Sequence, residues 1–205
     1  MRHAIVYDCE YLTREGAFRR NWSGPGDPDP LVVQIGAVKL GLDGECPLLD
    51  RRVLYVLPHD RQGRRCALDP YFTALTGVTE ATLEAEGLPL AEALTQLAAF
   101  AEGARLWCWG RDEYYLMAVS CYVAGIAPPI PASRFGNAAD LLVQAGATPE
   151  SLVGLQSGTL SRHYRLDHPP LRGHDALDDA LSVGYTLQHL LRTGAMTAEA
   201  LLTRQ

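Results

Sequence analysis

The chain has 205 residues, a formal net charge of −6 and 47% hydrophobic residues, as expected of one soluble globular domain. It has no apolar run of membrane-spanning length and no signal-peptide layout at its N-terminus, so we expect a cytoplasmic protein without a membrane partner. The five cysteines are scattered and odd in number, which favours reduced thiols over disulfides or a zinc site.

The first expected element is a buried strand over residues 4–10, an apolar run that ends in Asp8 and Glu10. Side chains alternate along a strand, so the two carboxylates share one face while Cys9 points to the other. Two carboxylates projected together repel each other and lose hydration unless a cation lies between them. Hard divalent cations with oxygen ligands meet that need. The pair therefore predicts a metal-dependent enzyme.

Residues 13–30 are polar and rich in glycine and proline, so no regular structure is expected there. The segment directly follows the acidic strand and contains Arg19, Arg20 and Trp22. Arginine suits phosphate oxygens, and an aromatic ring can stack on a base. Two interpretations are equally compatible with this composition, a flap over a nucleic-acid substrate and a plain surface insertion.

The next elements indicate the fold class. Residues 31–40 and 48–57 are expected to be strands joined by a turn, which predicts an antiparallel meander with the first strand. Helices and short strands then alternate. Helices are expected over residues 69–75, 79–86, 89–102, 112–124, 149–164 (interrupted at Gly154 and Gly158) and 175–191, and strands over residues 104–109 and within 134–140. This order predicts a single α/β three-layer domain with a five-stranded mixed sheet, a core over residues 4–191 and a C-terminal tail over residues 192–205.

The phase of the last helix separates two neighbouring aspartates. Its apolar residues form one stripe that should face the sheet: Ala176, Ala180, Val183 and Leu187. At about 100° per residue, Asp179 lies close to this stripe and Asp178 points roughly to the opposite side. Asp178 can therefore be an ordinary solvated carboxylate. Asp179 would be buried at a cost of several kcal/mol unless its charge is compensated.

Two further residues are candidates for the same site. Asp112 lies one turn before Tyr115 and Leu116, which we expect on the buried stripe of their helix with Val119 and Val123, while Glu113 is off to the side. Because Asp112 opens its helix, a capping role is the alternative. His174 stands five residues before Asp179, where an imidazole can reach a metal site; a surface histidine is the alternative.

Taken in order, Asp8-x-Glu10, Asp112 after a strand, and His174-x4-Asp179 resemble the DEDDh 3′–5′ exonucleases, which share a ribonuclease H-like fold. Residues 32–38 (VVQIGAV) and 72–79 (FTALTGVT) resemble the same family. The second segment is most similar to the ERI-1-like branch of RNA-trimming exonucleases. The sequence departs from the family pattern at Tyr7, Cys9 and Tyr11 around the first acidic pair, and in the Trp-Gly-Arg-Asp motif that contains Asp112.

The resemblance implies a reaction and a set of roles. Asp8, Glu10, Asp112 and Asp179 would hold two Mg²⁺ or Mn²⁺ ions, and His174 would take the proton from the attacking water. The products would be nucleoside 5′-monophosphates released from the 3′ end of a single-stranded nucleic acid. The expected substrate contacts are Cys9, Tyr11, Leu75, Arg19 and Arg20.

Several alternatives remain at this point. The Leu-Thr-Gly-Val segment slightly favours RNA or short oligonucleotides over DNA, the substrate of a proofreading-type exonuclease. A ribonuclease H-like endonuclease would also use clustered carboxylates, but the histidine five residues before the final aspartate favours an exonuclease. An inactive binding module is disfavoured because all five site positions are present. A homodimer or a larger complex with nucleic acid is compatible with the sequence.

Overall fold

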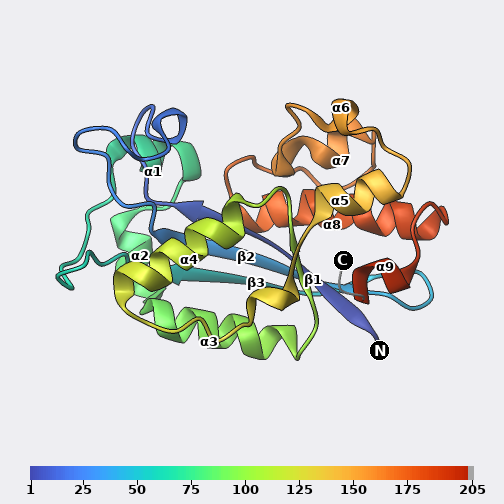
Figure 1. The fold of residues 1–205 in the computed structure, drawn as a ribbon, viewed down its shortest axis with the longest axis horizontal. Helices are drawn as coiled ribbons and strands as arrows, with labels where there is room; N and C mark the ends of the chain where they lie inside the picture. The colour runs from blue at the N-terminus through green and yellow to red at the C-terminus, as the bar shows by residue number, and fades with distance from the viewer. Residues whose placement is uncertain (203–205) are drawn as a thin grey trace.

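The computed structural model describes residues 1–202 as a mixed sheet flanked by helices (Figure 1). The strands are β1 (His3–Tyr11), β2 (Val32–Gly41), β3 (Leu48–Val56), β4 (Gly87–Leu88), β5 (Leu106–Cys108) and β6 (Phe135–Asn137). The helices are α1 (Pro70–Thr76), α2 (Glu80–Glu86), α3 (Leu90–Ala101), α4 (Asp112–Ala124), α5 (Ala138–Gln144), α6 (Pro149–Leu152), α7 (Leu160–His163), α8 (Ala176–Arg192) and α9 (Ala198–Leu202). Three 3-10 turns complete the order: η1 (Phe18–Arg20), η2 (Ala132–Arg134) and η3 (Ser157–Thr159).

The sheet has the strand order β4-β3-β2-β1-β5-β6. The expected meander is confirmed, because β2 pairs antiparallel with both β1 and β3. Strands β5 and β6 extend the other edge in parallel, β5 against β1 and β6 against β5. The α/β class with a mixed sheet is therefore confirmed. The sheet has one strand more than expected, because the two residues of β4 are too few to show a periodicity.

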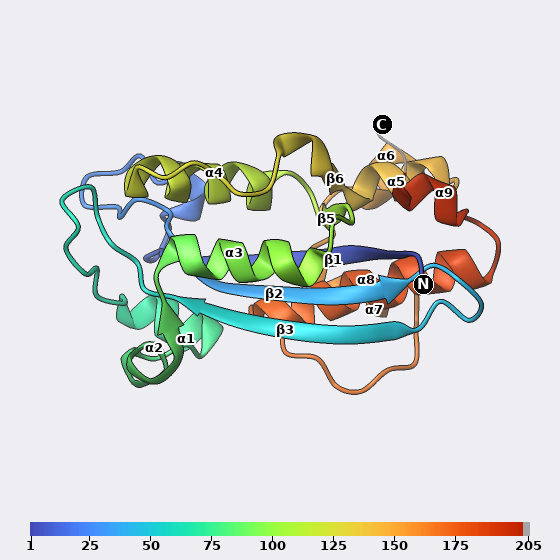
Figure 2. The same cartoon turned by 90° about the horizontal axis from the view of Figure 1, so that it is seen from below.

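The two faces of β1 pack into two different hydrophobic clusters. Ile5, Tyr7 and Cys9 pack with residues of α3 and α4. Ala4 and Val6 face the other way and pack with residues of α8. Figure 2 shows α3 in front of the central strands and α8 behind them. Since side chains alternate along a strand, Asp8 and Glu10 continue the face that Ala4 and Val6 begin, beside α8.

Residues 138–164 are divided more finely than expected. The helical stretch over residues 149–164, expected to be interrupted at Gly154 and Gly158, consists of α6, η3 and α7. Val153 is extended and Gly154 has a φ of +80°, a backbone conformation that ends a helix and favours glycine. Helix α5, in turn, was not expected as a separate element. Asn137 caps it, because its side chain accepts a hydrogen bond from the amide of Ala139.

The packed core extends beyond residue 191, into the expected tail. Met196 and Leu201 are buried in the cluster that includes Val183 and Leu187. The indole Nε1 of Trp107, a buried residue of β5, donates a hydrogen bond to the carbonyl of Leu201 at 3.2 Å. Residues 196–202 therefore cover one end of the domain. Within residues 1–202, no helix combines the length and the apolar character that crossing a bilayer requires.

Candidate active site

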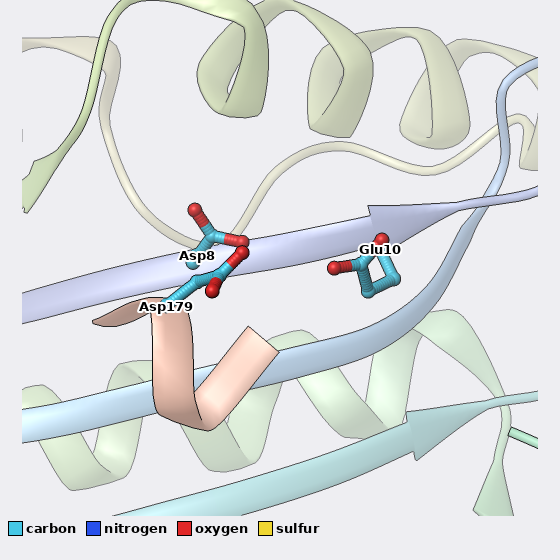
Figure 3. Close-up of side chains that lie close together, drawn as sticks. All are labelled: Asp8, Glu10 and Asp179. Atoms are coloured by element: carbon cyan, nitrogen blue, oxygen red, sulfur yellow. The ribbon is translucent and has the colours of Figure 1, made fainter. Parts of the chain in front are cut away.

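Asp8, Glu10 and Asp179 come together where β1 approaches the first turn of α8 (Figure 3). One carboxylate oxygen of each residue lies within 4.8 Å of the corresponding oxygen of the other two. Asp8 and Asp179 are buried, with only 4% and 6% of their surfaces exposed. The phase expected for α8 is confirmed, because the predicted stripe of this helix is buried and Asp179 lies beside it.

Strand β2 holds the first turn of α8 in place. The side chain of Gln34 is almost fully buried; its Nε2 donates to Asp175 Oδ2 at 3.2 Å, and its Oε1 accepts from the amide of Ala176 at 3.1 Å. Asp175 is also the N-cap of α8. A Cβ at Gly36 would overlap the backbone of Ala176, so only glycine lets the helix approach this closely. These contacts determine where Asp179 meets Asp8.

The environment of the three carboxylates fits a divalent cation. Asp8 Oδ1 and Asp179 Oδ1 are buried, and neither has a hydrogen-bond partner within residues 1–202. A buried oxygen without a donor costs free energy, and a charged one costs more. A hard cation such as Mg²⁺ or Mn²⁺ satisfies such oxygens and neutralises their repulsion. The donor set therefore suits the metal that the fold family implies.

The same environment raises the proton affinity of the carboxylates. Burial, followed by the charges of neighbouring acidic groups, raises the pKa of Asp8 well above its usual value. The pKa of Glu10 rises to about 8 and that of Asp179 to about 7, in both cases chiefly because of burial. The amide of His174, which donates to Asp179 Oδ2 at 3.3 Å, opposes this shift in Asp179. Without a cation, the site therefore binds protons near neutral pH.

The acidic residue of α4 whose charge acts on Asp8 is Glu113, where the sequence pattern favoured Asp112. Burial raises the pKa of Glu113 to about 8, and its charge contributes more than that of Asp179 to the raised pKa of Asp8. Asp112 is exposed and Glu113 is half-buried, and neither belongs to the cluster of metal-ligating oxygens found within residues 1–202. Asp112 as the fourth acidic group therefore stays a prediction, with Glu113 as the alternative.

The orientation of α4 differs from the expected one. Its buried residues are Met117, Ser120, Cys121 and Val123, whereas Tyr115, placed on the buried stripe by the sequence pattern, is largely exposed. Glu113 lies one turn before Met117 and therefore on the inner face. The Tyr11 hydroxyl fixes this end of the helix by donating to the carbonyl of Glu113 at 2.8 Å. Apolar residues occur all around α4, so its sequence alone does not identify the inner face.

The turn η3 lies against the carboxylates from a third direction. A Cβ at Gly158 would overlap Asp179 Oδ1, so a larger residue there would displace the carboxylate. The Ser157 hydroxyl stabilises the charged forms of Asp8 and Asp179 and so opposes the rise of their pKa values. Gly158 was expected only to interrupt a helical stretch, without a role at the site, and Ser157 was not named as a candidate. Their only signal is this interruption of the stretch over residues 149–164.

His174 is held by contacts on both sides of it. It is exposed, has a φ of +60°, and lies directly before the N-cap of α8. Two residues earlier, the amide of Arg172 donates to Asp178 Oδ2 at 2.8 Å, and its guanidinium donates to the carbonyl of Leu75 at 3.3 Å. Asp178, expected as a solvated carboxylate, thus accepts a backbone hydrogen bond. The charge of Arg172 also lowers the pKa of Glu10.

The side chains expected to contact substrate are mostly used by the fold. Cys9 and Tyr11 are buried in the core on the α4 side of the sheet, away from the carboxylates. Their burial follows from the alternation along β1 that exposes Glu10 on the other face. Leu75 is half-buried at the end of α1. Its carbonyl, which accepts from Arg172, brings this turn toward the site.

Residues 13–30 form a folded segment that includes η1. Arg20 pairs with Asp27 at 2.7 Å, and the Trp22 indole donates to the carbonyl of Leu12 at 3.0 Å. Both side chains therefore help to hold the segment together, and their contact with a substrate stays a prediction. Arg19 is exposed. It is the member of the Arg19–Arg20 pair that can still reach a ligand.

Comparisons with known proteins identify the fold. No protein-family model matches the chain, and no curated protein matches it in sequence. The nuclease domain of 3′hExo, a DEDDh family member bound to rAMP, aligns with a TM-score of 0.77 over 99% of this chain and 96% of its own, at 16% identity. The chain has the fold of the DEDDh 3′-exonucleases. It is the ribonuclease H-like architecture that the sequence resemblance implied.

Two other nucleases align over most of the chain. Cell-death related nuclease 4 (CRN-4) has a TM-score of 0.67 at 19% identity, over 95% of this chain and 66% of its own. E. coli ExoI in a zinc-bound complex with single-stranded DNA has a TM-score of 0.61 at 16% identity, over 93% of this chain and 41% of its own. At this level of identity, the likeness shows the fold.

The raised carboxylate pKa values predict how stability depends on pH and metal. Without metal, the folded protein holds protons that the unfolded chain has released above about pH 4.5. The resulting stabilisation is lost as pH rises through the folded-state values near 7 and 8. The melting temperature in EDTA should therefore fall between pH 6 and pH 8.5.

Mg²⁺ or Mn²⁺ should reverse this trend, because metal binding requires deprotonated carboxylates and so strengthens as pH rises. Thermal unfolding at matched ionic strength, with and without metal, measures both effects. Asp179→Asn is the control and should reduce the metal-induced stabilisation. A metal effect that is the same at both pH values would contradict the raised pKa values.

Proposed function

We propose that this protein is a metal-dependent 3′–5′ exonuclease that hydrolyses single-stranded nucleic acid to nucleoside 5′-monophosphates. The observation that carries this proposal is the convergence of Asp8, Glu10 and Asp179, with two buried and unpartnered carboxylate oxygens, on a DEDDh exonuclease fold. Such a set of oxygens has little structural use without a cation. The five unpaired cysteines favour a reducing compartment such as the cytoplasm.

The acidic residues would hold two Mg²⁺ or Mn²⁺ ions. Asp8, Glu10 and Asp179, whose carboxylate oxygens converge, would be their ligands. Glu113 would supply the fourth acidic group in place of Asp112, because its charge acts on Asp8. Ions bound there would neutralise the scissile phosphate and stabilise the attacking and leaving oxygens.

The remaining residues would position the reactants and move a proton. His174 would accept the proton of the attacking water on an imidazole nitrogen, the usual role of a histidine general base. The contacts of Arg172 with Leu75 and Asp178 would hold the loop that carries His174. The turn at Leu75 would border the terminal nucleoside, on the side of the site where Arg172 also lies.

RNA is the favoured substrate, with DNA as the alternative. The structure that covers nearly all of this chain is bound to rAMP, and another aligned 3′-exonuclease is described as recognising a histone mRNA stem-loop. The DNA alternative rests on ExoI, which is bound to single-stranded DNA and aligns less closely. The Leu-Thr-Gly-Val segment favours RNA as well.

Product analysis tests the proposal directly. A 5′-labelled single strand of RNA, and a DNA strand of the same sequence, should be shortened stepwise from the 3′ end in Mg²⁺ or Mn²⁺. Nucleoside 5′-monophosphates should accumulate, and Asp179→Asn should abolish them. Internal fragments as first products would instead identify an endonuclease. Binding without any metal-dependent cleavage would identify an inactive module.

Paired variants of α4 test which acidic residue acts. Glu113→Gln should lower turnover by about 10- to 100-fold or more, because it removes a charge that acts on Asp8. Asp112→Asn, its matched control one residue away, should stay within about twofold of the wild type because Asp112 is exposed. Initial rates at saturating metal and substrate measure both. Inactivation by Asp112→Asn alone would restore the expectation from sequence.

His174→Ala tests the general base. It should lower kcat by about 10²- to 10⁴-fold while the metal-induced rise in melting temperature is retained. His163→Ala, which alters an exposed histidine on α7, is the control. Single-turnover rates ensure that the chemical step is measured. Near wild-type rates in His174→Ala would remove the histidine from the mechanism.

A further inference from the structure

A groove of about 270 Å³ lies between the start of α4 and the edge strand β6, outside the carboxylate cluster. We call it the α4–β6 groove. Its volume lies just below the usual range for small-molecule sites, about 300–1,000 Å³, and so suits a fragment such as one nucleobase better than a folded duplex. The lining residues that matter for its chemistry are Cys108, Arg111, Tyr114, Tyr115, Phe135 and Asn137.

The groove adjoins the site through the connection between β5 and α4. Strand β5 is parallel to β1, so the C-terminal ends of the two strands lie at the same end of the sheet. Gly110 and Arg111 line the groove, and two residues later comes Glu113, whose charge acts on Asp8. The amide of Gly110 donates to Asn137 Oδ1 at 2.9 Å, which fixes this connection against the start of α5.

One wall of the groove is aromatic. Tyr114 lies between Phe135 and Tyr115, with ring centroids 5.2 Å and 5.5 Å away. Tyr114 and Phe135 are half-buried and support the wall from below. Tyr115 is 53% exposed although it is large and apolar in body. An exposed ring on a rigid aromatic base is the kind of surface on which a nucleobase stacks.

The groove is also lined by a positively charged side chain, that of Arg111. Arg111 is exposed, and within residues 1–202 its side chain makes no hydrogen bond or ion pair. By contrast Arg105, also in the lining, donates to the carbonyls of Ser133 and Phe135 and so supports the fold. A guanidinium with all its donors available suits a phosphate oxygen of a nucleic-acid backbone. The groove therefore has a partner for the base and a partner for the phosphate of a nucleotide.

The position of the groove indicates which part of a strand it would meet. Figure 2 shows β6 at the level of α4, on one side of the central strands, and α1 on the other side, near β3. The proposed function places the terminal nucleoside on the α1 side, near Leu75. The strand that continues on the 5′ side of the scissile phosphate must then leave toward β6.

We propose that the α4–β6 groove binds the single strand on the 5′ side of the scissile phosphate, with Tyr115 stacking on a base and Arg111 pairing with a backbone phosphate. This inference rests on the proposed function. It makes the groove a determinant of strand binding, separate from the chemistry at the carboxylates. Arg111 would also give a protein of negative net charge a local positive contact for the nucleic-acid backbone.

The test compares two substrates. One is an eight-nucleotide RNA; the other is a nucleoside 5′-(p-nitrophenyl phosphate), which has no nucleotide on the 5′ side of the scissile phosphate. Tyr115→Ala and Arg111→Ala should each raise KM for the RNA about tenfold and leave kinetics on the small ester within twofold. Tyr115→Phe should restore binding, because it keeps the ring. Arg111→Ala should also reduce the salt dependence of RNA binding by about one charge.

Tyr122→Ala is the matched control. Tyr122 is on the same helix and is 71% exposed, but it packs against Arg61 outside the groove. It should leave KM for the RNA unchanged. Equal losses on both substrates, or an unaltered KM for the RNA in Tyr115→Ala and Arg111→Ala, would overturn the groove proposal.

A binding measurement separates this proposal from the proposed function. Fluorescence anisotropy of the labelled RNA reports strand binding without turnover. Weaker binding in Tyr115→Ala, in a protein that hydrolyses neither substrate, would support the groove and reject the exonuclease. Wild-type binding in both groove variants of an active enzyme would reject the groove alone.

Discussion

Mutual repulsion among buried carboxylates is the constraint on which this structure depends. Asp8 and Glu10 come from the first strand and Asp179 from the last long helix, so the fold must hold like charges from opposite ends of the chain together. Several features offset the repulsion. The amides in the first turn of α8 carry partial positive charge, and the amide of His174 donates to Asp179. Protons bound near neutral pH, or bound cations, offset the rest of the repulsion between the carboxylates.

Strand β2 makes this arrangement possible. Gln34 links the N-cap of α8 to the sheet with two hydrogen bonds, and Gly36 allows backbone contact with the first turn of the helix. Both residues lie on the strand next to β1, and they position Asp179 through the first turn of α8. Substitution of Gln34 or Gly36 would move Asp179 although every acidic side chain of the site is retained. The scaffold around the site therefore matters as much as the ligands do.

The chain must also bind a polyanion if the proposed function holds, although its net charge is −6. Many of its arginines are engaged in the fold, as with Arg20 at Asp27 and Arg172 at Leu75. Cations held by the acidic cluster would invert its charge where the phosphate binds. Exposed arginines beside aromatic rings, as at Arg111, would supply the remaining attraction. Binding of this kind is local and does not require a basic surface.

The sequence alone determined the features that depend on local periodicity. Alternation along β1 places Asp8 and Glu10 on one face, and the regular apolar stripe of α8 places Asp179 toward the sheet. Only the tertiary structure decided the inner face of α4, because apolar residues surround this helix and packing against β1 selects Glu113. The same holds for Gly158, whose contact with Asp179 joins segments 21 residues apart. Such contacts depend on how elements meet in space, which local patterns do not encode.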